Sequence, residues 1–147
     1  MNMNLFKALY CNQYYELEPK GKGEEANMYG TRLLTIALVF NVISCFILLM
    51  LLSPDFLDWW DDLLKDLFGR RQSRVVGKLV ALVPFVVVYP MVRFSLGTEA
   101  NYSRLIERFK SLPAEDQKRI SRKGLYYFLA STGLVIVCFI LTLVFLT

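Results

Sequence analysis

Two long runs of apolar residues constrain this chain more than any other feature. Residues 33–52 and 125–146 contain no Asp, Glu, Lys or Arg. At about 1.5 Å rise per residue, each run is long enough as a helix to cross the roughly 30 Å hydrocarbon core of a bilayer. A helix in a soluble protein is apolar on one face, whereas these runs are apolar all round. They predict two transmembrane helices in an all-α, integral membrane protein.

A further span, the second in chain order, is predicted over residues 75–96. Lys78 and Arg93 lie near its two ends, where long cationic side chains can reach the headgroups. Pro84 and Pro90 each remove a backbone donor and predict kinks. Because the uninterrupted apolar stretch is short for a crossing, a re-entrant or interfacial hairpin is the alternative.

The connection over residues 53–74 is predicted to contain an amphipathic interfacial helix at 55–68. Ser53-Pro54-Asp55 is typical of a helix start, with a capping hydroxyl, a proline and an acidic first turn. At helical spacing, Trp60 falls on an apolar face and the acidic residues fall on the opposite one. An acidic face cannot be held by anionic lipid, so the apolar face must insert into lipid or cover a neighbouring protein.

Two further segments flank the spans. Residues 1–32 are mildly amphipathic and predict a short helix on the membrane surface, with a separate binding module as the alternative. Residues 97–124 form a charged loop that predicts two short helices. The first of these carries an apolar stripe at helical spacing that could dock on the N-terminal segment: Tyr102, Leu105, Ile106, Phe109 and Leu112.

The distribution of basic residues predicts the orientation in the cell membrane. Three crossings place residues 1–32, with four Lys or Arg, on the same side as residues 93–123, with eight. Residues 53–78, on the opposite side, contain five. Basic residues accumulate in cytoplasmic loops, so the N-terminus is expected in the cytoplasm and the C-terminus outside. The first and third spans would then run parallel, with Cys45 and Cys138 at similar depth.

Small and polar residues within the spans predict where the helices meet. Ala37, Asn41, Ser44 and Cys45 form one stripe on the first span, and residues 130–133 form a small-residue patch that includes Gly133. Such residues allow close approach of helices and give an amide a partner. Helix packing is the interpretation that we favour for Asn41, with a ligand contact as the alternative.

The sequence carries no motif for chemistry. It contains no histidine, no Cys-x-x-Cys motif and no ionisable residue at mid-depth in a span. We therefore expect no catalytic activity, no metal and no cofactor. The basic residues are not interleaved with aromatic residues as nucleic-acid binding would require, so no nucleic-acid partner is expected.

We accordingly expect a single membrane domain that acts as an accessory or scaffold subunit of a larger membrane complex. Its partners would be the lipid bilayer and other membrane subunits or further copies of itself. One alternative is a homo-oligomeric pore or carrier lined by Thr35, Asn41 and Ser44, and another is a membrane-resident immunity or inhibitor protein that captures a basic effector. The candidate interaction residues are Asn41, Ser44, Asp58, Trp59, Trp60, Asp62, Asp66 and Gly133.

Overall fold

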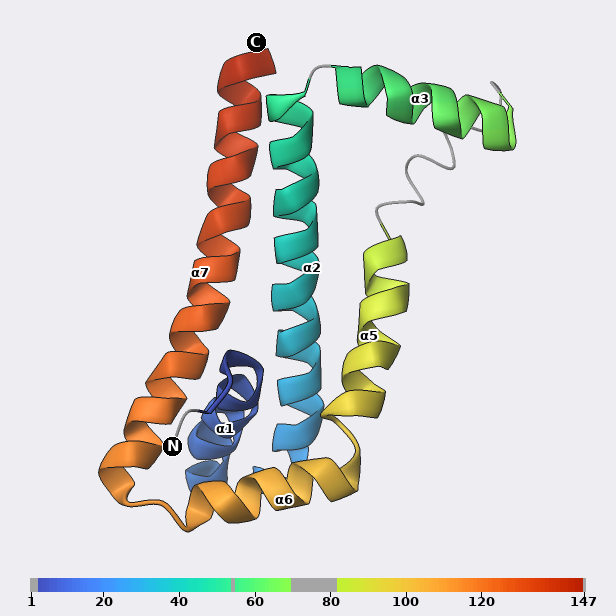
Figure 1. Cartoon of the computed structure of the whole chain (residues 1–147). Helices are drawn as coiled ribbons and strands as arrows, with labels where there is room; N and C mark the ends of the chain where they lie inside the picture. The colour runs from blue at the N-terminus through green and yellow to red at the C-terminus, as the bar shows by residue number, and fades with distance from the viewer. Residues whose placement is uncertain (1–2, 54, 70–81, 147) are drawn as a thin grey trace.

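The computed structural model describes residues 3–53, 55–69 and 82–146 (Figure 1). Within these ranges the chain is 90% helical and has no strand, which confirms the all-α prediction. Two helices, α2 (Ala26–Leu52) and α7 (Ala114–Leu146), are long and apolar enough to cross a membrane. They pack side by side and run in the same direction, as predicted for the first and third spans.

The helix α5 (Val83–Ser95) packs against α2 and runs in the opposite direction (Figure 1). It covers the second part of the span predicted over residues 75–96, while residues 75–81 lie outside the described residues. Pro84 lies in the first turn, where its missing N–H is not needed, so it begins the helix rather than kinking it. Pro90 lies inside the helix.

The N-terminal helix α1 (Leu5–Leu17) packs against α2 and α7 near the ends where both begin (Figure 1). Ala8 to Asn12 are five consecutive residues, and all of them are buried. Consecutive buried residues require cover on every side of the helix. The predictions of a surface helix or a separate module were therefore wrong, because α1 forms the core of this end of the molecule.

The helix α6 (Glu99–Lys110) docks on α1 through its apolar stripe, as predicted. The ring of Tyr102 lies 6.1 Å from that of Tyr10, and the ring of Phe109 lies 6.5 Å from that of Tyr14. These contacts join the N-terminal segment to a helix about ninety residues later in the chain.

A separate short helix before the third span was predicted wrongly, because α7 runs without interruption from Ala114 through Gly124 into the apolar run. Gly124 is buried against α1. A Cβ at this position would lie 2.7 Å from Leu9 Cα and would overlap the carbonyl group of Ala8. The glycine therefore permits a close approach of two helices rather than ending one.

Replacing Gly124 by Ala should lower the stability of the protein. The added methyl group collides with backbone atoms that cannot rotate away, and overpacking of this kind costs about 1–3 kcal/mol. Gly133→Ala is the matched control, because its Cβ meets no atom within 4 Å and alanine favours a helix by up to about 1 kcal/mol. Unfolding in mixed micelles measures the change in the free energy of unfolding for each variant. Equal changes at the two positions would contradict the close approach at Gly124.

Candidate functional site

The contact between α2 and α7 contains two of the predicted interaction residues. Asn41 Nδ2 donates to Tyr127 Oη at 3.1 Å. Ser44 is fully buried, and the Cys138 thiol lies 3.9 Å from its carbonyl oxygen. Cys45 is exposed and does not share this contact, so Cys138 faces Ser44 rather than Cys45. Asn41 and Ser44 thus act in helix packing.

Gly133, by contrast, does not lie in this contact. Nothing approaches its Cβ position within 4 Å, and of residues 130–133 only Ser131 is buried. Four consecutive residues wrap fully around a helix, so few of them can face a single neighbour. The buried residues of α7 instead recur at helical spacing, through Gly124, Ser131, Val135 and Cys138.

The polar residues expected to line a pore bond within the chain. Thr35 Oγ1 donates to the Thr31 carbonyl at 2.8 Å, and Ser44 Oγ donates to the Phe40 carbonyl at 2.8 Å. Together with the Asn41 bond to Tyr127, these contacts occupy a donor of each side chain. The polar side chains that favoured a pore therefore form hydrogen bonds within α2 and between α2 and α7.

The helix α3 (Asp55–Phe68) has the bounds that the sequence predicts. Phe46 of α2 packs against the start of α3. The ring of Phe46 lies 5.4 Å from the rings of both Phe56 and Trp60. Trp59 is 56% exposed. From this attachment α3 runs sideways from the end of α2 and extends away from α7 (Figure 1). The two tryptophans thus differ, since Trp60 fastens α3 to α2 and Trp59 is presented outward.

The acidic side chains of α3 are exposed, Asp58, Asp62 and Asp66 among them. Lys65 Nζ lies 2.6 Å from Asp61 and 3.3 Å from Asp62. The hydrogen bond to Asp61, followed by that to Asp62, raises the pKa of Lys65. One lysine stands against five aspartates in this helix, so α3 presents a strongly negative surface.

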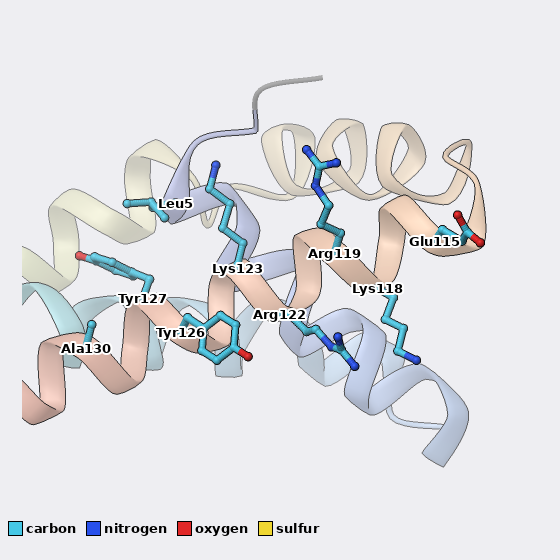
Figure 2. A pocket seen from close by; sticks show the side chains of 9 residues that line it. All are labelled: Leu5, Glu115, Lys118, Arg119, Arg122, Lys123, Tyr126, Tyr127 and Ala130. Carbon is cyan, nitrogen blue, oxygen red and sulfur yellow. The ribbon is translucent and has the colours of Figure 1, made fainter.

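Sequence reasoning missed a basic pocket of about 840 Å³ at the start of α7. Leu5 of α1 contributes to it, and Figure 2 shows Lys118 and Arg122 projecting to one side of α7 and Arg119 and Lys123 to the other. The cation pairs at i and i+4 are the signal in the sequence that indicates this site. The remaining lining residues are Glu115, Tyr126, Tyr127 and Ala130.

A second pocket, of about 570 Å³, lies between the start of α1 and α6. Its basic residues are Lys7, Arg104 and Arg108. Asn4 and Asn101 also contribute to the lining of this second pocket. Among the described residues, the first pocket has no such amide side chains and instead borders the apolar run of α7.

Two pairs of buried polar groups in the α1 core bond to each other, whereas the buried Tyr102 hydroxyl has no hydrogen-bond partner among the described residues. Tyr10 Oη and Thr31 Oγ1 are 2.8 Å apart, and Asn12 Nδ2 donates to Ser121 Oγ at 2.9 Å. Burial raises the pKa of the Cys11 thiol to about 12, so this thiol is protonated at neutral pH and is a poor nucleophile. In the three described ranges, no group of three or more His, Cys, Asp or Glu residues is placed to hold a metal ion.

Comparison with family models, with curated protein sequences and with solved structures gave no match.

Proposed function

We propose that this chain is a three-span protein of the cell membrane, with α2, α5 and α7 as its spans. Support comes from large apolar side chains that are exposed on all three helices, such as Leu49, Val86 and Ile136. Exposed apolar surface costs about 25 cal/mol per Å² in water, and soluble monomers rarely expose large patches of it. Lipid tails would remove this cost.

The arrangement of the other helices fits three crossings. The helices α1 and α6 lie at one end of the bundle and α3 at the other (Figure 1). The thirteen residues of α5 span about 20 Å of a hydrocarbon core of roughly 30 Å. The excess of Lys and Arg at the α1 and α6 end supports an orientation with that end in the cytoplasm and α3 outside.

Within this topology, the protein serves as an accessory or scaffold subunit that binds a larger membrane protein through α3. The observation that carries this proposal is the outward presentation of Trp59 on a helix attached to the bundle at its start. Exposed tryptophans are frequent energetic centres of interfaces, and a charged surround guides a partner of opposite sign. The partner would therefore present a basic surface on the outer side of the membrane.

Co-purification in mild detergent with the variant Trp59→Ala tests this role. Loss of an interface centre costs about 2 kcal/mol or more, so recovery of the partner should fall at least tenfold. Phe139→Ala is the control, since Phe139 is also 56% exposed but lies on α7 within the apolar run. Recovery of the bare chain, or of further copies alone, would contradict a scaffold role, and recovery of a soluble basic effector would favour an inhibitor.

A further inference from the structure

The pocket at the start of α7 combines free positive charge with an apolar floor. Within the described part of the chain, Lys118, Arg119, Arg122 and Lys123 form no ion pair with a carboxylate. Lys123 Nζ donates to the Met3 carbonyl at 2.9 Å and so links α7 to the start of the chain. The floor is formed by Leu5 and by aromatic and small residues of α7. The site suits a ligand that has both an anionic group and an apolar part.

The depth of these cations follows from the helix rise. The apolar run begins at residue 125, so Arg122 and Lys123 lie about 3–5 Å beyond its edge at 1.5 Å per residue. Each headgroup layer is about 5–8 Å thick. Arg122 and Lys123 are therefore level with lipid phosphates when α7 spans the membrane. Lys118 and Arg119 lie about 9–11 Å beyond the edge, on the aqueous side of that layer.

We propose that this pocket binds the headgroup of an anionic glycerophospholipid from the cytoplasmic leaflet. Arginine forms paired hydrogen bonds to phosphate oxygens, and lysine adds a mobile charge. Basic pockets beside membrane helices at the cytoplasmic face are suited to such headgroups. The acyl chains would follow Tyr126 and Ala130 along the apolar surface of α7. This inference rests on the proposed membrane topology, because lipid reaches the pocket only if α7 spans the bilayer.

The geometry favours a lipid over a soluble anion or an acidic peptide. A soluble phosphate would use the cations but not the apolar floor, which is continuous with the apolar run of α7. Glu115 lies at the far end of the pocket, away from that run, and repels an anion there (Figure 2). The charge pattern thus directs an anionic group toward the membrane side of the pocket.

Lipid binding to the full-length protein tests the proposal. The protein in a neutral detergent is exposed to phosphatidylglycerol or phosphatidylcholine, and bound lipid is counted by native mass spectrometry. We expect a clear preference for phosphatidylglycerol. The double variant Arg119→Gln/Arg122→Gln should reduce that preference about tenfold, since each cation near the surface contributes substantially to anionic lipid binding. Arg104→Gln/Arg108→Gln is the matched control, which removes two arginines from α6 and should change the preference less than twofold.

Several outcomes would overturn the proposal. If the two double variants lose the same amount of preference for phosphatidylglycerol, the effect comes from net charge and not from this pocket. Displacement of the lipid by millimolar inorganic phosphate, or by a soluble polyglutamate peptide, would assign the pocket to a soluble anion or an acidic partner. If the protein resists alkaline extraction from membranes but shows no preference for phosphatidylglycerol, the lipid site alone is rejected. If alkaline extraction releases the protein, the proposed topology is rejected as well.

Discussion

Ile136→Arg should reduce membrane insertion of α7 by about two orders of magnitude. Ile136 lies midway along the apolar run and is 52% exposed. An arginine at the centre of a membrane helix costs about 2.5–3.5 kcal/mol on insertion scales, and each 1.4 kcal/mol is a factor of ten. If water surrounded α7, the same change at an exposed site would alter stability by less than about 0.5 kcal/mol. A single substitution thus separates the two environments.

The measurement uses a glycosylation acceptor appended to the C-terminus, which is modified only in chains whose end has crossed the membrane. Leu129→Arg is the control, because Leu129 is 53% exposed but lies near the start of the apolar run. At that depth the arginine can extend to the headgroups, so most of the insertion should remain. Full glycosylation of the Ile136→Arg variant would contradict a lipid environment for α7.

Local signals in the sequence are sufficient for several elements of the fold. The Ser53-Pro54-Asp55 start and Gly69 bracket α3, and the structure gives this helix the predicted bounds. The end of α2 at Leu52 likewise coincides with the end of the first apolar run. Caps, charges and apolar runs act within a few residues, so they can be recognised without knowledge of tertiary contacts.

The packing of α1 against α7 could not be predicted because residues far apart in the sequence form it. The bond between Asn12 and Ser121 joins positions 109 residues apart, and nothing in either segment identifies the other. The two glycines of α7 show the same limit. Gly133 lies among small residues and has no close neighbour, whereas Gly124 lies beside charged residues and is in tight contact with α1. The basic pocket also requires Leu5 of α1 beside α7, which sequence spacing does not reveal.

Phe109→Ala should unfold the end formed by α1 and α6 while leaving the long helices in the membrane. Phe109 is 1% exposed, and its ring meets those of Tyr14 and Tyr15 edge-on at 6.5 Å. Removing a buried phenylalanine costs about 3–5 kcal/mol, a large part of the stability of a small domain. Each long helix satisfies its own backbone hydrogen bonds in lipid, so its insertion does not require this packing.

Hydrogen exchange in lipid nanodiscs distinguishes the two parts of the molecule. The Phe109→Ala variant should lose protection in α1 and α6 by two or more orders of magnitude and retain it in the apolar parts of α2 and α7. Phe94→Ala is the control, because Phe94 is 76% exposed and should leave α1 protected. Loss of protection throughout α2 and α7 in the Phe109 variant would show that the α1 core holds the long helices together. In that case the close contact at Gly124, rather than lipid, would govern the stability of the bundle.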